Sequence, residues 1–207
     1  MKPVTVIGHP LVQCQLTRLR DARTAPMEFR RLLRELATLM AVEVTRSLRL
    51  KRVAVRTPLE KTTGFELERG VVLVPVLRAG LGMVEPLLQL IPEARVGFLG
   101  LKRDEATLLP HSYHRSLPKD LAAAEVILID PMLATGGSAV AALDQLRAAG
   151  ARRLRLLCLV AAPEGIARVR QDYKTLPIFT AAIDRQLNDV GYILPGLGDA
   201  GDRLFGT

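Results

Sequence analysis

The segment VILIDPMLATGGSA, residues 126–139, decides the fold because it joins an apolar strand to a helix through a turn of small residues. The apolar run brings Asp130 to the carboxyl end of the strand. Gly136 and Gly137 let the backbone approach a ligand closely, and the first N–H groups of the following helix have no partner inside it. The segment therefore predicts a cradle for a phosphate monoester.

A simpler interpretation is open for the turn itself. A bare Thr-Gly-Gly-Ser sequence is more often an ordinary strand-to-helix connection in which Ser138 caps the helix. Asp130 favours ligand binding, because a carboxylate after VILI is costly to bury unless sugar hydroxyls or a hydrated cation compensate it. The lysine and spacing of a Walker loop are missing from the turn, so hydrolysis of a nucleoside triphosphate is disfavoured.

Strands and helices alternate along the chain on both sides of this segment. Apolar strands are predicted at residues 70–77, 94–101, 125–130, 153–162 and 177–183, with helical segments within 77–91, 131–151 and 162–173. Apolar strands that alternate with helices indicate an α/β fold, a mostly parallel twisted sheet covered by helices on both faces. In such sheets ligands bind beyond the carboxyl ends of the strands.

Three further segments complete the organisation of one predicted domain, residues 1–207. Residues 53–68 alternate and turn through 61–64, which favours a hairpin arm for packing or dimer contact. The polar loop 102–119 is longer than most connections, so we expect a flexible flap that acts as a lid. After Pro26, an amphipathic helix is predicted from the helical spacing of Leu32, Leu33, Leu36, Met40 and Val44.

Composition limits the classes of function. The 207 residues carry a formal net charge of +8, which fits either attraction to nucleic acid or a site for several phosphate groups. Aromatic residues make up 4% of the chain and Trp is absent, so there is little material for stacking unpaired bases. Apolar runs such as 71–77 are far shorter than the ~18 to 20 residues that span a membrane.

The remaining signals favour a soluble, cytoplasmic protein. The amino-terminal MKPVTVIGHP has no apolar stretch of signal-peptide length. Cys158 lies in an apolar run and is interpreted as a buried hydrophobic side chain rather than a disulfide or metal ligand. His111 and His114 are interpreted as surface residues, so no protein metal site is predicted.

Four ordered motifs resemble the uracil phosphoribosyltransferase family. DPMLATGGSA (130–139) resembles its signature for binding 5-phosphoribosyl 1-diphosphate (PRPP), and VPVLRAGLGM (74–83) resembles its pyrophosphate loop. GLKRDEATL (100–108) resembles the base of its mobile flap, and GYILPGLGDAGDRLFGT (191–207) its uracil-binding carboxyl terminus, a hood over the base. The resemblance implies transfer of the phosphoribosyl group to uracil, which gives UMP and pyrophosphate in pyrimidine salvage.

The resemblance also implies roles for individual residues. The expected catalytic residues are Asp130, which meets the ribose hydroxyls, and Arg78 and Arg103, which face the pyrophosphate. Arg78 and Arg103 would otherwise be surface arginines, but a guanidinium fork suits phosphate oxygens. The expected PRPP-binding residues are Arg78, Arg103, Asp130, Pro131, Met132, Leu133, Ala134, Thr135, Gly136, Gly137, Ser138 and Asp199. The expected uracil-binding residues are Ile193, Gly198, Asp199 and Ala200.

The family further implies Mg²⁺ as cofactor, GTP as an effector in some members, and a homodimer or higher homo-oligomer. The residue after Asp130 is Pro131 rather than a second acid, so the substrate's oxygens and water are expected to hold most of the magnesium. Cys14 and Lys102 depart from the expected histidine and tyrosine. GLGDAG (196–201) formally matches a dinucleotide fingerprint, but too few residues follow for the required helix and strand. An RNA-binding regulator on the same fold and transfer to a purine base are the alternatives.

Overall fold

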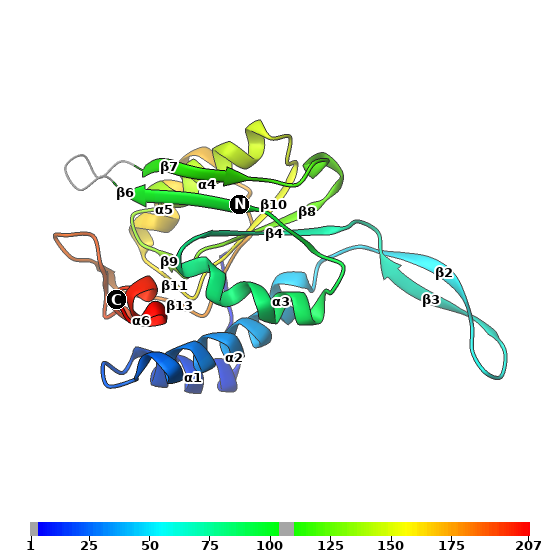
Figure 1. Cartoon of the computed structure of the whole chain (residues 1–207), viewed down its shortest axis with the longest axis horizontal. Coiled ribbons are helices and arrows are strands. Elements are labelled where there is room, and N and C mark those ends of the chain that lie inside the picture. Colours follow the sequence, from blue (N-terminus) through cyan, green and yellow to red (C-terminus); the bar gives the residue numbers. More distant parts are fainter. Residues whose placement is uncertain (1–3, 104–109) are drawn as a thin grey trace.

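The computed structural model describes residues 4–103 and 110–207 (Figure 1). Helices and strands alternate along it as the sequence predicts. The helices are α1 (Pro10–Arg20), α2 (Pro26–Thr45), α3 (Val84–Leu90), α4 (Gly137–Ala148), α5 (Pro163–Asp172) and α6 (Ala200–Phe205), with 3₁₀ turns η1 (Ala79–Met83) and η2 (Leu121–Ala123). The longer strands are β2 (Leu50–Arg56), β3 (Lys61–Leu67), β4 (Val71–Leu77), β6 (Phe98–Arg103), β7 (Pro110–Ser116), β8 (Glu125–Ile129) and β10 (Arg153–Leu157). The shorter ones are β1 (Val4–Val6), β5 (Arg95–Val96), β9 (Met132–Leu133), β11 (Val160–Ala161), β12 (Ile178–Thr180), β13 (Ala182–Ile183), β14 (Gln186–Leu187) and β15 (Ile193–Leu194).

The central sheet confirms the predicted α/β class. Its strands run in the order β1-β12-β10-β8-β4-β6-β7, and β5 adds to β4. The described pairs within it are parallel except β6 with β7, which is antiparallel. A three-stranded parallel sheet, β13-β11-β9, continues beyond the carboxyl ends of β12, β10 and β8. Strand β9 of this smaller sheet contributes residues to the candidate site.

The apolar strands are buried on both faces, which explains why they lack polar alternation. Along β4, Val71 and Leu73 belong to one core cluster, whereas Val72 and Val74 belong to the other. Helices α1, α2, α3 and α6 cover the first face, while α4 and α5 cover the second. Figure 1 shows α1 to α3 together on one side of the sheet. The predicted helix after Pro26 is confirmed as α2, and its apolar residues face the core.

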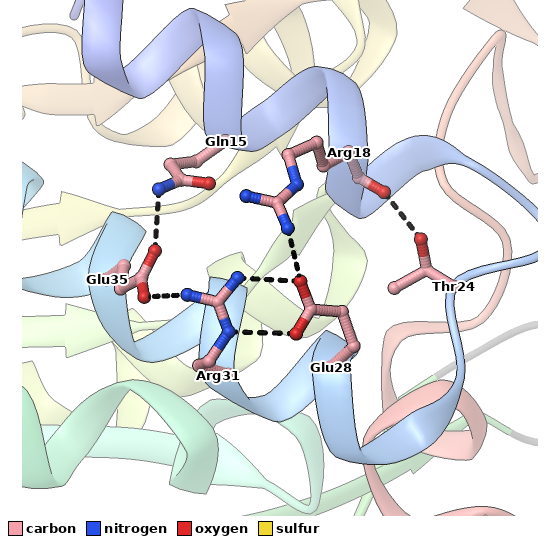
Figure 2. A network of polar contacts seen from close by, with 6 residues as sticks. All are labelled: Gln15, Arg18, Thr24, Glu28, Arg31 and Glu35. Carbon is pink, nitrogen blue, oxygen red and sulfur yellow. Dashed lines mark hydrogen bonds and ion pairs between the residues drawn. The ribbon is translucent and has the colours of Figure 1, made fainter.

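A polar network joins α1 to α2 across their outer surfaces (Figure 2). Glu28 accepts hydrogen bonds from Arg18 at 2.7 Å and from Arg31 at 2.6 and 2.8 Å. Arg31 also pairs with Glu35, whose other oxygen accepts a hydrogen bond from Gln15 at 2.6 Å. Solvent-exposed pairs of this kind contribute little each because water screens their charges, so the apolar α1–α2 contact dominates. The network therefore follows the packing of α1 against α2 and does not determine it.

The hairpin arm is confirmed, although its turn was placed wrongly. Strands β2 and β3 pair antiparallel from Leu50–Leu67 to Arg56–Lys61, and the arm extends away from the body (Figure 1). The turn lies at residues 57–60, because the Thr57 hydroxyl accepts hydrogen bonds from the N–H groups of Leu59 and Glu60. Residues 61–64, expected to turn, are strand residues.

Part of the predicted lid loop 102–119 is also regular structure. Residues 110–116 form β7 and pair with β6, so the loop is shorter than its polar composition suggested. The central part of the expected flap, residues 104–109, lies outside the described residues. His111 and His114 on β7 are exposed, and Cys158 is buried, as expected. In the described ranges, no helix combines the length and apolar character that crossing a bilayer requires.

Candidate active site

A cavity of about 490 Å³ lies beyond the carboxyl ends of the central strands. Three parts of the chain form it: the turn after β8, the start of η1, and the segment from 190 to 201. These parts are far apart in sequence and meet because parallel strands end at the same edge. The lining residues are Ala79, Asp130, Met132, Leu133, Ala134, Thr135, Gly136, Ser138, Ala139, Val190, Gly191, Tyr192, Ile193, Gly198, Asp199, Ala200 and Gly201.

Asp130 follows the last residue of β8 and is held by the backbone around it. Its N–H donates to the carbonyl of Leu157 at 3.1 Å, and its Oδ1 accepts a hydrogen bond from the N–H of Met132 at 3.3 Å. Burial raises the pKa of the Asp130 carboxyl to about 7, although the Met132 N–H lowers it. No described side chain forms an ion pair with this carboxylate. A ligand hydroxyl would therefore meet a carboxylate that burial has left poorly compensated.

The turn before α4 is shaped by two glycines on different elements. Gly136 caps the helix with φ +82°, a left-handed conformation that favours glycine. A Cβ on Gly136 would lie 2.7 Å from the carbonyl oxygen of Gly165, and a Cβ on Gly165 would lie 2.3 Å from that of Ala134. The first turn of α5 therefore supports the cradle at backbone distance, and neither position has room for a side chain.

The carboxyl-terminal segment closes the other side of the cavity. Strand β15 pairs with β14, and the chain then turns through Gly196 and Gly198, which have φ of +60° and +77°. Asp199 follows and caps α6 by accepting a hydrogen bond from the N–H of Asp202 at 2.9 Å. Gly198, Asp199 and Ala200 therefore face the cavity from a turn with a fixed backbone.

An ion pair between two distant residues holds this segment in place. The guanidinium of Arg20, at the end of α1, donates to both carboxylate oxygens of Asp184 at 2.7 Å. Arg20 also donates to the carbonyl of Gly196 at 2.6 Å, while the N–H of Gly196 donates to Asp184 at 2.9 Å. Both polar groups of the Gly196 backbone are thus held by this pair, which we call the Arg20–Asp184 clamp. The Asp184 side chain is 6% exposed.

Arg203 ties the same segment to α1 a second time. Its guanidinium donates to the carbonyls of Leu19 and Leu197 at 2.8 Å and of Asp21 at 2.6 Å. It also lies 4.6 Å from the centre of the Phe29 ring. Burial lowers the pKa of Arg203, with Asp21 opposing the shift. Arg203 and the clamp together make the wall of the cavity depend on the position of α1.

Most of the predicted site residues line this one cavity. From the phosphate turn they are Asp130, Met132, Leu133, Ala134, Thr135, Gly136 and Ser138, and from the carboxyl-terminal segment Ile193, Gly198, Asp199 and Ala200.

Pro131, Gly137 and Arg78 do not line the cavity, and the side chain of a fourth predicted site residue, Arg103, is outside the described part of the structure. The Pro131 carbonyl accepts hydrogen bonds from the N–H groups of Leu159 and Val160, and Gly137 begins α4. The Arg78 guanidinium lies 3.3 Å from Asp202 and 5.7 Å from the Phe205 ring centre, and its neighbour Ala79 lines the cavity. Arg103 ends β6, and its side chain lies outside the described residues.

The sequence reasoning missed the clamp and residues 190–192 of the cavity wall. A signal for Asp184 was present, because it follows the apolar strand segment PIFTAAI just as Asp130 follows VILI. Its partner Arg20 could not be found by pattern, since 164 positions separate the two residues. Cys14, one of the two departures from the family pattern, is exposed on α1.

Solved structures share this fold. A protein from Aquifex aeolicus matches with a TM-score of 0.94 and 38% identity, over 99% of both chains. A purine phosphoribosyltransferase from Pyrococcus horikoshii matches with a TM-score of 0.51 and 14% identity, over 74% of this chain and 83% of that one. The fold is therefore that of the phosphoribosyltransferases.

Sequence comparisons identify the family within that class. The family model for uracil phosphoribosyltransferase matches residues 6–207. The uracil phosphoribosyltransferase of Dictyoglomus thermophilum is 54% identical over 205 residues, which cover 99% of each chain. That of Paracoccus denitrificans is also 54% identical, over 99% of this chain and 97% of its own. The chain belongs to the uracil phosphoribosyltransferase family and is accordingly a pentosyl-transferring enzyme, as the motifs predicted.

Proposed function

We propose that this enzyme transfers the 5-phosphoribosyl group of PRPP to uracil, which gives UMP and pyrophosphate. The observation that carries the proposal is the single cavity shared by the turn after Asp130 and the segment 193–200. The first part suits a sugar phosphate and the second a flat base. With both ligands bound in this way, the anomeric carbon of the sugar would lie between the two parts.

The phosphate cradle is assigned to the turn from Pro131 to Ser138. The free N–H groups at the start of α4 and the hydroxyls of Thr135 and Ser138 would receive the 5′-phosphate. The Asp130 carboxylate would accept hydrogen bonds from the ribose hydroxyls and stabilise positive charge that grows on the sugar ring as the bond to pyrophosphate breaks. Pro131 and Gly137 act through the shape of the turn, since neither lines the cavity.

Uracil is assigned to Ile193, Gly198, Asp199 and Ala200, with Asp199 also near PRPP. Uracil presents two carbonyl acceptors and an N–H donor, a pattern that fixed backbone groups can match. Cytosine has a different exocyclic group and would leave buried polar groups unpaired, at about 1–3 kcal/mol each. The clamp would hold Gly196 and thereby the position of these groups.

Magnesium is proposed as the cofactor. Within the described ranges, no three His, Cys, Asp or Glu side chains gather to hold a metal ion. Mg²⁺ commonly binds through one or two carboxylates, several waters and substrate phosphates, so the cavity carboxylates Asp130 and Asp199 fit an ion delivered with PRPP. When bound, the ion would supply charge neutralisation for the leaving pyrophosphate, to which Arg78 and Arg103 would add.

Several wider properties belong to the same proposal. We infer a single domain over residues 1–207, a cytoplasmic location, and a homodimer or higher homo-oligomer to which the hairpin arm contributes. Leu59 and Phe65 support that role for the arm, because their side chains are exposed. GTP is proposed as an effector. Neither a membrane nor a nucleic acid is expected as a partner.

One assay tests the activity directly. The protein is incubated with PRPP, Mg²⁺ and each of uracil, cytosine, hypoxanthine, guanine and adenine, and pyrophosphate release is measured. We expect release with uracil alone. Release with a purine would overturn the choice of base, and specific RNA binding without base-dependent release would favour the RNA-binding regulator.

Arg103→Ala tests the pyrophosphate side of the cavity. We expect the KM for PRPP to rise roughly tenfold or more, because a charge-assisted contact to a phosphate is lost, with a smaller change in the KM for uracil. Arg115→Ala, on the neighbouring strand β7, is the matched control. Unchanged PRPP kinetics in the Arg103 variant would contradict its role.

Asp184→Asn tests the clamp as a positioning device for the base. Loss of one partner from a buried pair leaves Arg20 poorly compensated, so we expect a loss of about 3 kcal/mol in stability. The KM for uracil should rise more than the KM for PRPP, since Gly196 belongs to the base side.

Glu125→Gln is the control for Asp184→Asn. It weakens a second, largely buried ion pair, Glu125 with Arg155 at 2.9 Å, at the other end of the sheet. We expect a comparable loss of stability with both KM values unchanged. Equal effects of the two substitutions on the KM for uracil would mean that the clamp stabilises the fold and does not position the base.

A further inference from the structure

A second cavity, of about 500 Å³, lies at the opposite end of the central sheet from the candidate active site. Glu125 begins β8, Arg153 begins β10, and Pro177 precedes β12, and all three line this cavity. The active-site cavity follows the other ends of these strands. Ser47 and Arg69 bring in the base of the hairpin arm, which projects from the end of the molecule remote from α6 (Figure 1).

The chemistry of this cavity differs from that of the active site. Arginine side chains outnumber carboxylates six to one among its lining residues. The arginines come from four places: the connection between α2 and β2, the connection between β3 and β4, the end of α4, and the start of β10. They are Arg49, Arg69, Arg147, Arg152, Arg153 and Arg155.

Arg155 is the fixed centre of the group. It is 7% exposed and donates to the carbonyl of Val44 at 2.6 Å, to the Ser47 hydroxyl at 3.2 Å and to Glu125 at 2.9 Å. Arg153 lies 3.9 Å from the same glutamate. The one carboxylate of the lining is therefore already shared by two guanidinium groups, and it does not compensate the others.

Three of the arginines are free to meet a ligand. Arg49, Arg147 and Arg152 are exposed, and none of them forms an ion pair with a carboxylate in residues 4–103 or 110–207. Arg147 is held over the ring of Tyr173, 5.5 Å from its centre, and the Tyr173 hydroxyl donates to Asp144 at 2.5 Å. The direction of Arg147 is thus set without its positive charge being neutralised.

Solvated faces of a basic protein spread their like charges, because crowding them costs free energy. Here six arginines converge on a concavity whose lining holds one carboxylate, Glu125, while Arg69 is paired with Glu68 beside it. A guanidinium fork suits phosphate oxygens, and the volume is that of an ordinary small-ligand site. We propose that this cavity binds a compact polyphosphate anion of two or three phosphate groups. An RNA backbone fits less well, because Tyr173, the one aromatic residue of the lining, is buried and offers no stacking surface.

Inorganic tripolyphosphate is the probe, titrated calorimetrically into the full chain in magnesium-free buffer at fixed salt. UMP at saturation occupies the active site in a parallel titration. We expect about one tripolyphosphate per chain to bind whether or not UMP is present. The double variant Arg147→Gln with Arg152→Gln should weaken this binding roughly tenfold or more, with turnover of uracil unchanged.

The matched control is Arg34→Gln with Lys119→Gln, which removes two exposed positive charges outside both cavities. We expect its affinity for tripolyphosphate to stay within about twofold of the parent, as only the general field of the protein changes. Equal affinities in the two double variants, or loss of all binding in the presence of UMP, would overturn the proposal. The comparison of variants needs no UMP, so it is independent of the uracil activity.

The source of the anion is resolved by further arms with pyrophosphate and each nucleoside triphosphate. Equal affinities for triphosphates with and without a nucleoside would mean that the phosphates alone are recognised. Tighter binding of one nucleotide, lost in the double variant at Arg147 and Arg152, would identify a nucleotide site on the same arginines. Binding of an RNA oligonucleotide without any binding of tripolyphosphate would refute the polyphosphate assignment.

Discussion

Asp130→Asn should lower kcat for uracil by on the order of 100-fold or more while the fold is retained. The substitution keeps the size of the side chain and an oxygen that can accept the hydrogen bond from Met132, which is 3.3 Å away. It removes the negative charge proposed to oppose the positive charge on the sugar. Steady-state kinetics and circular dichroism measure the two outcomes. Near-normal turnover in a folded variant would remove Asp130 from the mechanism.

The same substitution should make the ligand-free protein more stable at neutral and higher pH. Burial raises the pKa of Asp130 from 3.8 to about 7, so the folded protein keeps a proton that the unfolded chain has released. The free energy of unfolding therefore falls as pH rises through this interval and is constant above it. Asparagine has no such proton to lose.

We expect Asp130→Asn to be more stable than the parent by on the order of 2 kcal/mol at pH 8, with a smaller difference at pH 5. The gain is less than the full pKa shift implies, because the carboxyl opens on a cavity that water enters. Chemical denaturation at the two pH values measures it. A difference independent of pH would contradict the assigned shift.

Gly136→Ala should have the second large effect, on the use of PRPP. A Cβ at this position meets the carbonyl oxygen of Gly165 at 2.7 Å and must adopt φ near +82°, so the turn has to move. We expect kcat/KM for PRPP to fall by roughly tenfold or more, because N–H groups that move with the turn lose their hydrogen bonds to the phosphate.

Gly150→Ala separates this effect from backbone strain alone. Gly150 follows the other end of α4 with φ +92°, and a Cβ there meets nothing within 4 Å. Both variants should lose about 1–2 kcal/mol of stability from the left-handed conformation. Only the Gly136 variant should lose PRPP affinity, measured by the KM for PRPP; equal kinetics in the two would argue against the cradle.

The sheet was predictable because its signals are local. The run VILI and the apolar residues of β4 each predict a strand that is buried on both faces, whichever segments pack against it. The hairpin turn was misplaced because Gly64 looked like a turn residue. In the structure it pairs with Val53 across the arm, and a Cβ there would lie 2.7 Å from a Val55 methyl group. The glycine allows close cross-strand packing instead.

The candidate site was predictable only in part, for a related reason. The turn after Asp130 is a local feature, so its cavity-lining residues could be chosen from the sequence. The wall at 190–192 and the clamp depend on α1 meeting the carboxyl-terminal segment, which no periodicity encodes. Strand β7 was missed because HSYHRS carries few of the apolar residues that mark a strand.

The contact between Gly165 and the Ala134 carbonyl has a consequence for engineering. A Cβ at Gly165 would come within 2.3 Å of that oxygen. Gly165 does not line the cavity, yet a side chain there would displace the backbone of the phosphate turn. Libraries aimed at new bases can vary cavity-lining side chains of the carboxyl-terminal segment such as Ile193, but they should leave Gly196 and the opening turn of α5 untouched. A substitution in that turn would weaken PRPP binding, and a screen for activity on a new base would mistake that loss for a change in base specificity.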